Sequence, residues 1–462
     1  MLYPKSRADV VAALTLLAEP PHRDVRLTPR GGGTGTNGQS LTDGLVLDVS
    51  RHLDGILELD LAARTVRVEP GVVLDALQDH LRPHGLFFAP ELSPSNRATL
   101  GGMISTDAAG KGSRVYGKTS EHVRRLTTVL LGGDVIDSAP LDDAALAALT
   151  ARDDRVGAIH RTLDDIATDK AALITEVFPK LRRFMTGYDL AHIRRDDGTF
   201  DLNAILCGSE GTLGVVVEAT LALTPIPTCA ALVVLGYARF DDALGSAEAL
   251  VERRPAAIET IDQMVLDLAR GDAIWPKVER LLGAVDSKRL QAINLVEFTG
   301  TDPAAVEERV AALITSLAAG QGSHPPISQT IARDPADITA LWSLRKKGVG
   351  LLGNAPGARK PVPFVEDTVV PPENLRAYIA EFRALLDAEG LRYGMFGHID
   401  VGCLHVRPAL DMKDPEDEAR LHRISDRVCD LVQRYGGVIW GEHGKGMRTA
   451  YSPRFFGPLW PE

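Results

Sequence analysis

Three histidines and a glutamate occupy two short motifs in the C-terminal third of the sequence. His398 and His405 stand seven residues apart in FGHIDVGCLH, and WGEHGKG places Glu442 directly before His443. Two imidazoles and one carboxylate are a suitable ligand set for Zn²⁺ or a similar divalent ion, which would leave His443 as a free base. The alternative, which is more common for an arbitrary pair at this spacing, is that the two histidines are unrelated core or surface residues.

A glycine-rich run near the N-terminus has the composition of a phosphate-binding loop. Residues 31–38 read GGGTGTNG, with five glycines in eight positions. Glycines permit positive φ and bring backbone N–H groups close to an anion, and short hydroxyl and amide side chains add donors. The composition suits a pyrophosphate, with a flexible linker as the alternative. The candidate cofactor-binding residues are Arg30, Gly31, Gly32, Gly33, Thr34, Gly35, Thr36 and Asn37.

Two further segments are rich in small residues and could contact the same ligand. Residues 90–110, PELSPSNRATLGGMISTDAAG, could lie flat against a planar ring, and residues 207–216, CGSEGTLGVV, join a turn to an apolar strand. Either segment alone is weak evidence, because small-residue loops also form closely packed turns. The candidates here are Pro94, Ser95, Gly101, Gly102, Ser105, Thr106, Gly110, Gly208, Glu210, Gly211, Gly214, Val215 and Val216.

The elements that must position these motifs fall into two groups. The first group mixes short strands (24–27, 45–49, 56–59, 65–68 and a hairpin over 126–136) with helices over 10–18 and 72–81. After the proline-containing segment LTPIPT, longer helices are expected over 241–252, 303–317, 373–388 and 415–435, with strands over 231–236, 293–298 and 438–440. This change favours a second α+β domain with an antiparallel sheet. His398 and His405 are expected on a hairpin that turns near Gly402.

The bulk composition excludes several classes of protein. A chain of 462 residues is too long for one core, and a net charge of −11 opposes binding to nucleic acid or to an anionic membrane surface. The sequence has neither an apolar run long enough to span a membrane nor a secretory signal. The four cysteines are Cys207, Cys229, Cys403 and Cys429. They form no C-x-x-C pair, so no iron–sulfur or zinc framework is visible, and their small number suits a reducing cytoplasm.

Taken together, the three small-residue segments identify a family. RGGGTGTNG, residues 94–110 and CGSEGTLG resemble the FAD-binding (PCMH-type) domain of the vanillyl-alcohol oxidase type, in its D-2-hydroxy-acid dehydrogenase branch. The resemblance covers essentially the whole chain and is strongest to the bacterial FAD/iron–sulfur D-2-hydroxyglutarate dehydrogenases. It implies an α+β protein with a FAD-binding domain over 1–224, an α+β substrate or cap domain with an antiparallel sheet over 225–435, and a return segment over 436–462 that carries Glu-His.

The resemblance also implies roles for the motif residues. The glycine loop would hold the pyrophosphate of FAD, bound non-covalently because the loop lacks the histidine that tethers FAD in related oxidases. Matching residues place a divalent metal on His398, His405 and Glu442, and let His443 act on the substrate hydroxyl. One departure is that the family often has Asn two residues after the second histidine, where this chain has Arg407.

A hydroxy-acid substrate brings at least one carboxylate and therefore needs a cation. Arg345 in LWSLRKK is the first candidate, because Arg can hold a carboxylate by two parallel hydrogen bonds, and Lys360 is the second. Both match family positions that hold substrate carboxylates, although a solvated helix charge is the alternative for Arg345. The second carboxylate of a dicarboxylate would need another cation, and the candidates are Lys346, Lys347 and Arg407.

The expected reaction is oxidation of a D-2-hydroxy acid to the 2-oxo acid, with hydride transfer to flavin N5 and electrons passed to an acceptor other than oxygen. D-2-hydroxyglutarate is the expected substrate, with D-lactate or glycolate as the alternative. Members of the resembling subfamily begin earlier and continue into cysteine-rich iron–sulfur domains. An iron–sulfur or other electron-acceptor protein is therefore the expected partner. A truncated flavin-binding protein without turnover is the alternative from a different class.

Overall fold

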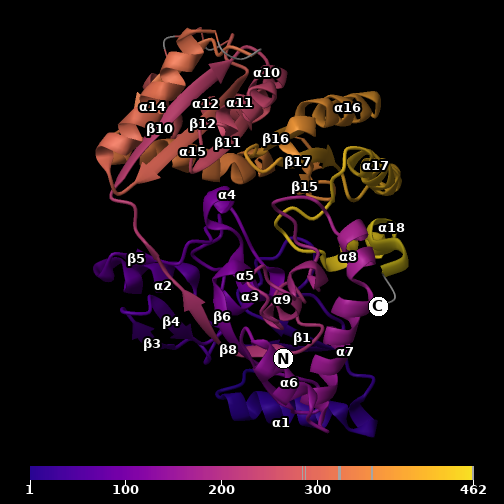
Figure 1. Ribbon diagram of the computed structural model, residues 1–462. Helices are drawn as coiled ribbons and strands as arrows, with labels where there is room; N and C mark the ends of the chain where they lie inside the picture. The colour runs from indigo at the N-terminus through magenta and orange to yellow at the C-terminus, as the bar shows by residue number, and fades with distance from the viewer. Residues whose placement is uncertain (284, 287, 321–323, 355–356, 460–462) are drawn as a thin grey trace.

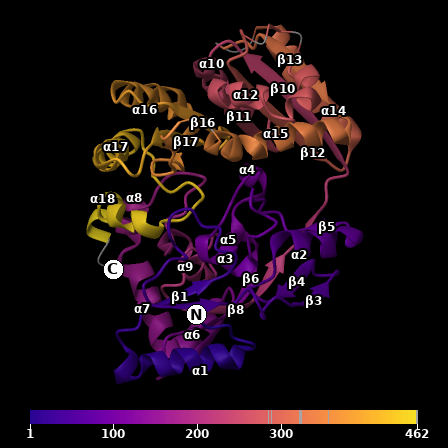
Figure 2. The same cartoon turned by 180° about the vertical axis from the view of Figure 1, so that it is seen from behind.

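The structure is a computed structural model, and it describes residues 1–459 apart from 284, 287, 321–323, 355 and 356. Two bodies, each built on its own sheet, lie one above the other in Figure 1. A single connection leads from β8 (Val215–Ala222) and β9 (Thr224–Pro225) of the lower body into β10 (Cys229–Tyr237) of the upper one. Figures 1 and 2 show that the C-terminal segment then returns to the lower body, where α18 (Ser452–Phe456) lies beside α8 (Ala171–Val177). No helix of the described chain combines the length and apolar character needed to cross a membrane.

The lower body is built on a five-stranded antiparallel sheet of order β3-β4-β8-β6-β7. Alternate residues of its central strand β8 are buried, as expected for a strand with a core on one face. The strands are β3 (Ile56–Asp60), β4 (Thr65–Val68), β6 (Val123–Val129), β7 (Val135–Ser138) and β8 (Val215–Ala222). The predicted hairpin over 126–136 is confirmed, and it turns at Gly132 and Gly133, both with positive φ.

Two small sheets and a set of helices complete the lower body. Parallel strands β1 (Leu27–Arg30) and β2 (Leu45–Asp48) lead into and out of the glycine loop, while β5 (Leu86–Phe87) pairs with β9 (Thr224–Pro225). The helices are α1 (Arg7–Ala18), α2 (Leu74–Leu81), α3 (Leu100–Thr106), α4 (Ser113–Tyr116), α5 (Thr119–His122), α6 (Asp143–Thr150), α7 (Arg155–Asp169), α8 (Ala171–Val177) and α9 (Asn203–Leu206). The strand expected over 24–27 is misplaced, because a 3₁₀ helix at Pro20–His22 delays the strand until Leu27.

The upper body is an eight-stranded antiparallel sheet with helices on both faces. Its order is β13-β10-β12-β11-β16-β17-β14, and β15 also pairs with β17. The strands are β10 (Cys229–Tyr237), β11 (Ala257–Asp262), β12 (Ala292–Gly300), β13 (Ser328–Ala332), β14 (Lys360–Pro361), β15 (Thr368–Val369), β16 (Tyr393–His398) and β17 (Cys403–Leu410). The predicted antiparallel sheet of the second domain is confirmed.

Each face of this sheet has its own apolar core, because successive side chains of a strand point to opposite faces. In β10, Ala231, Val233 and Leu235 contribute to one core and Leu232 and Val234 to the other. The first core is covered by α10 (Phe240–Gly245), α11 (Ala247–Val251), α14 (Pro303–Ala318), α16 (Leu375–Ala388) and α17 (Pro415–Arg434). The second is covered by α12 (Gln263–Arg270), α13 (Trp275–Val278) and α15 (Pro335–Gly353).

Three of the long helices begin with the same local device. Asp302, Asp334 and Asp414 are N-caps whose side chains accept a backbone N–H, and each is followed by proline at the first helical position. A carboxylate cap satisfies a free N–H, and proline has none to lose there. This signal explains why the helices expected over 303–317 and 415–435 are found almost at their predicted bounds.

Two further expected elements are wrong in detail. The helix expected over 241–252 is broken between α10 and α11, where the hydroxyl of Ser246 donates to the carbonyl of Ala243. The strand expected over 438–440 shrinks to a single bridge between Val438 and Val369, after which the chain turns toward the lower body.

Candidate active site

A cavity of about 680 Å³ lies between the two bodies. Its lower wall comes from the glycine loop and from residues of the 91–111 and 210–216 segments, and its upper wall from α15, β16, β17 and the return segment. This volume lies in the usual range for sites that bind small molecules or cofactors. The three small-residue segments and the His/Glu motifs, far apart in the sequence, therefore face one space.

Most of the predicted cofactor-binding residues line this cavity. They are Arg30, Gly31, Gly32, Gly33, Thr34, Gly35, Thr36, Pro94, Gly101, Gly102, Ser105, Thr106, Gly110, Glu210, Gly211, Gly214, Val215 and Val216. Asn37, Ser95 and Gly208 do not line it. The side chain of Asn37 instead donates to the carbonyl of Gly444 at 2.8 Å, and so holds the return segment.

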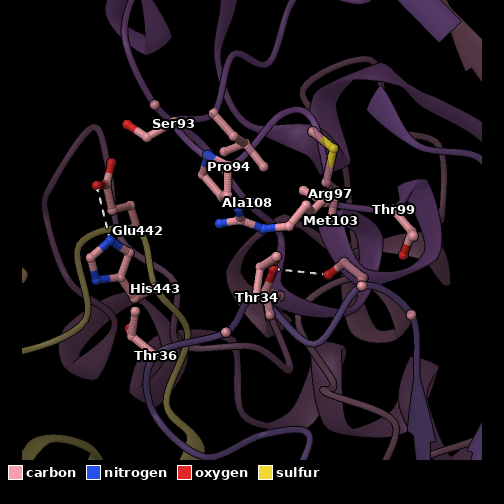
Figure 3. A pocket seen from close by; sticks show the side chains of 18 of the residues that line it. Thr34, Thr36, Ser93, Pro94, Arg97, Thr99, Met103, Ala108, Glu442 and His443 are labelled. Atoms are coloured by element: carbon pink, nitrogen blue, oxygen red, sulfur yellow. Dashed lines mark hydrogen bonds and ion pairs between the residues drawn. The ribbon is translucent and has the colours of Figure 1, made fainter. Parts of the chain in front are cut away.

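The glycines let the lower-wall loops touch one another backbone to backbone. A Cβ on Gly32 would lie 1.9 Å from the carbonyl oxygen of Arg97, and one on Gly110 would lie 1.8 Å from that of Glu91. Larger residues would therefore separate the loops. Figure 3 shows Thr34 and Thr36 on the loop and the side chain of Arg97 extending into the cavity. Hydroxyls and a guanidinium beside an open backbone form a suitable cradle for a pyrophosphate.

Glu442 is the centre of the cluster on the upper wall. Its Oε2 lies 3.1 Å from His398 Nε2, and its Oε1 lies 2.9 Å from His405 Nε2 and 3.2 Å from His443 Nε2. The rings of His405 and His443 stack with centroids 5.1 Å apart. The predicted hairpin supplies two of these histidines, since His398 ends β16 and His405 lies on β17, with the turn at Gly402. Figure 3 shows the paired Glu442 and His443 beside the same cavity.

Charged residues behind this cluster hold it in place. Glu442 pairs with the buried guanidinium of Arg183, and its backbone N–H donates to Asp367 at 2.7 Å. His443 donates its backbone N–H to Asp367 at 2.9 Å, and its Nδ1 lies 3.2 Å from Glu366. None of these three partners was expected from the sequence. The paired carboxylates of Glu366 and Asp367, after an apolar run, are the signal that could have revealed two of them.

The lower body fixes the return segment that carries Glu442 and His443. Gln39, just after the glycine loop, donates to the carbonyl of His443 at 2.6 Å, and the N–H of Gly446 donates to Glu210 at 3.0 Å. The position of His443 is therefore set by both bodies.

The carboxylates give this cluster a strong electrostatic bias. Burial raises the pKa of Glu366, but contact with His443 and the charge of Arg407 outweigh it and hold this pKa at about 2. Burial lowers the pKa of His443, yet Asp367 and Glu366 together raise it well above its usual value. Burial also opposes charge on the other two histidines. Glu259 and Glu442 outweigh it and raise the pKa of His398, whereas at His405 burial prevails and lowers the pKa.

The arrangement includes a group of atoms that could bind a metal ion. Ligand atoms of Asp367, His405, Glu442 and His443 all lie within 4.8 Å of one another. This group shares His405 and Glu442 with the set expected from the sequence, while His398 contacts the other oxygen of the same carboxylate.

Three cations line the cavity on its upper side. Arg345 and Lys346 lie on α15, and Arg407 lies on β17, two residues after His405 and so on the same face of the strand. Lys347 does not line it and pairs with Asp272 at 2.7 Å. Lys360, the second residue expected to bind a substrate carboxylate, is exposed on β14 and is not brought to the cavity either.

A half-buried lysine joins the two bodies at the rim of the cavity. Lys111 Nζ lies 3.3 Å from Glu91 of the lower body and 3.0 Å from Glu297 of β12, and it sits 4.3 Å above the ring of Trp342. Trp342 donates its indole N–H to the same Glu297. These contacts hold α15, and with it Arg345, against the lower wall.

Asp262 gives a test of the charge balance near the site. It is buried at the start of α12, where it accepts backbone N–H groups from Val265 and Met395. Burial raises its pKa to about 7 against these hydrogen bonds. Since an unfolded Asp has a pKa of ~3.9, the charged form destabilises the fold above pH 7, and this penalty fades as the pH falls toward 4.

The free energy of unfolding of Asp262→Asn, taken relative to that of the unchanged protein, should therefore be higher at pH 8 than at pH 5. The measurement is the free energy of unfolding from urea titrations at the two pH values. A difference between variant and unchanged protein that is the same at both would contradict the raised pKa.

Comparisons with known proteins agree with this geometry. Residues 226–462 match the family described as FAD linked oxidases, C-terminal domain, and residues 1–139 match a FAD binding domain. The chain is 54% identical over 460 residues to a D-2-hydroxyglutarate dehydrogenase of Pseudomonas putida, covering 100% of this chain and 46% of that protein. It is 51% identical to one of Escherichia coli, covering 99% and 45%. The chain thus spans less than half the length of these curated relatives.

Solved structures share the fold at low sequence identity. A 4-ethylphenol oxidase from Gulosibacter chungangensis aligns with a TM-score of 0.64 at 14% identity, covering 98% of this chain and 83% of that one. An alkyldihydroxyacetonephosphate synthase aligns with a TM-score of 0.62 at 15% identity, covering 99% and 74%. With the family matches, these neighbours confirm the expected fold class, and the FAD binding domain supports FAD as the cofactor.

Proposed function

This chain belongs to the family of FAD-linked oxidases, and we propose that it oxidises D-2-hydroxyglutarate to the 2-oxo acid. The observation that carries the proposal is one cavity whose lower wall is a phosphate-binding cradle and whose upper wall is the cluster around Glu442. The relatives from Pseudomonas putida and Escherichia coli, both named D-2-hydroxyglutarate dehydrogenase, support the choice of substrate.

FAD would lie along the lower wall, held non-covalently. The backbone of residues 31–36 and the hydroxyls of Thr34 and Thr36 would face its pyrophosphate, with Arg97 as a cation nearby. The small residues of α3 and of the 210–216 segment leave room for its ring system.

A divalent cation such as Zn²⁺ would be held by His398, His405 and Glu442. Both histidine Nε2 atoms already lie within 3.1 Å of this carboxylate, and Asp367 adds negative charge nearby. Imidazole nitrogens with a carboxylate form a donor set that suits zinc. When bound, the cation would polarise the substrate hydroxyl. FAD would accept, as hydride, the hydrogen on the carbon that carries this hydroxyl.

In its neutral form, His443 would take the proton of the substrate hydroxyl on Nε2. Its Nδ1 lies 3.2 Å from Glu366, and its main chain is anchored on Asp367 and Gln39. A carboxylate behind the imidazole fixes the ring and stabilises the charge that it gains, as in other His–carboxylate pairs.

Three cations would select a dicarboxylate. Arg345 would bind the carboxylate next to the reacting carbon, and Arg407 and Lys346 would face the second carboxylate from the same wall. We do not assign a substrate contact to Lys360, which lies outside the cavity.

The electrons would pass to an acceptor protein, of iron–sulfur or other type, in the cytoplasm. The name dehydrogenase of the two relatives supports an acceptor other than oxygen. The four cysteines, Cys207, Cys229, Cys403 and Cys429, are free thiols, which suits a reducing compartment.

A dye-reduction screen tests this function. The FAD-loaded protein is mixed with an artificial electron acceptor and with D-2-hydroxyglutarate, D-lactate, glycolate or D-malate. We expect the highest kcat/KM with D-2-hydroxyglutarate. A higher value with D-lactate or glycolate would overturn the choice of substrate, and no reduction with any of the four would indicate a flavin-binding protein without turnover.

A further inference from the structure

Glu259 connects the two functional parts of the upper wall through one carboxylate. Its Oε1 is hydrogen bonded to Nδ1 of His398, and its Oε2 accepts from Nε of Arg345 at 2.7 Å. The side chain is buried, with 1% of its surface exposed, and it lines the cavity. We propose that Glu259 is a positioning residue that orients both the metal ligand His398 and the substrate-binding Arg345, an inference that rests on the proposed function.

The sheet fixes the contact between Glu259 and His398. The two residues are direct cross-strand partners in the antiparallel pair β11–β16, so their side chains lie on the same face and close together. When Glu259 accepts a hydrogen bond from Nδ1–H, the proton of His398 stays on Nδ1 and Nε2 carries the lone pair. This Nε2 faces Glu442. A carboxylate behind a metal-binding histidine typically tightens metal binding by about 10–100-fold.

The same carboxylate sets the orientation of Arg345. The guanidinium is held at Nε by Glu259, and it lies 4.6 Å above the ring of Phe396, the residue two before His398 on β16. With Nε fixed in this way, the two terminal amino groups remain as the fork that can hold a carboxylate in the cavity.

Structural stability alone is a weak reason for this arrangement. All six residues of β11 are buried, and a carboxylate in such a strand loses its hydration. Replacing a buried ion pair by apolar residues of similar volume is often neutral or stabilising. Glu259 is the point where the candidate metal ligand and the candidate substrate cation meet, which gives the buried charge a role in the reaction.

The experiment measures cation binding separately from turnover. FAD-loaded protein is stripped of metal, and its affinity for Zn²⁺ is determined by competition with a chromogenic chelator. For Glu259→Gln we expect Zn²⁺ binding weaker by about 10-fold or more, a raised KM for D-2-hydroxyglutarate and an unchanged flavin spectrum. Glu259→Asp, which keeps the charge, should recover part of both losses.

Asp262→Asn is the matched control. It removes a second buried carboxylate from the same strand, and Asp262 does not line the cavity. We expect it to leave Zn²⁺ affinity and KM unchanged. Equal Zn²⁺ affinity in Glu259→Gln and the unchanged protein would overturn the positioning role alone, as would losses of the same size in Asp262→Asn. If the unchanged protein binds no Zn²⁺, the proposed cation site fails and the inference fails with it.

Discussion

Replacing His443 with alanine is expected to slow the reduction of bound FAD by D-2-hydroxyglutarate on the order of 10²–10⁴-fold. The variant lacks the imidazole that would accept the hydroxyl proton, whereas the loops of the lower wall that would hold FAD are unchanged. The measurement is the bleaching of the flavin absorbance after rapid anaerobic mixing with substrate.

His192→Ala is a suitable control for this experiment. His192 pairs with Asp189 and lies outside the cavity, so its loss removes a histidine without touching the cluster around Glu442. We expect normal bleaching in this control and a normal FAD content in both variants. Rapid bleaching in His443→Ala would show that another group accepts the proton.

The parts of the site that could be predicted are those carried by local motifs. A glycine loop after a strand, and an adjacent Glu-His pair flanked by glycines, have recognisable residue types at short spacing. The hairpin between His398 and His405 was predictable too, because Asp400 and Gly402 mark its turn. These predictions needed no knowledge of the long-range contacts.

Residues that act from separate segments could not be predicted in this way. Arg183 and Glu259 lie in different parts of the chain outside any motif, and only strand pairing and the return segment bring them to the cluster around Glu442. Strand alternation could have favoured Arg407 over Lys360, since Arg407 is two residues from His405 and shares its face. Asn37 has the right residue type for a phosphate loop, but its side chain is hydrogen bonded to the carbonyl of Gly444 in the return segment.

Arg183→Met is expected to lower the free energy of unfolding by about 3–5 kcal/mol, because it leaves the buried carboxylate of Glu442 without its guanidinium partner. Only 2% of the Arg183 surface is exposed, so water has little access to solvate the carboxylate of Glu442 once the guanidinium is lost. Urea titration of the metal-free protein, followed by tryptophan fluorescence, measures the loss.

A double-mutant cycle separates this pairing from the packing of a large side chain. Glu442→Gln removes the carboxylate charge, so Arg183→Met should cost much less in its presence than alone. If Arg183→Met instead destabilises the Glu442→Gln protein as much as it does the unchanged one, packing rather than charge explains the loss. A strong coupling would mean that Arg183 of the lower body fixes the carboxylate of Glu442 at the centre of the upper-wall cluster. The site would then be complete only when the two bodies are packed together.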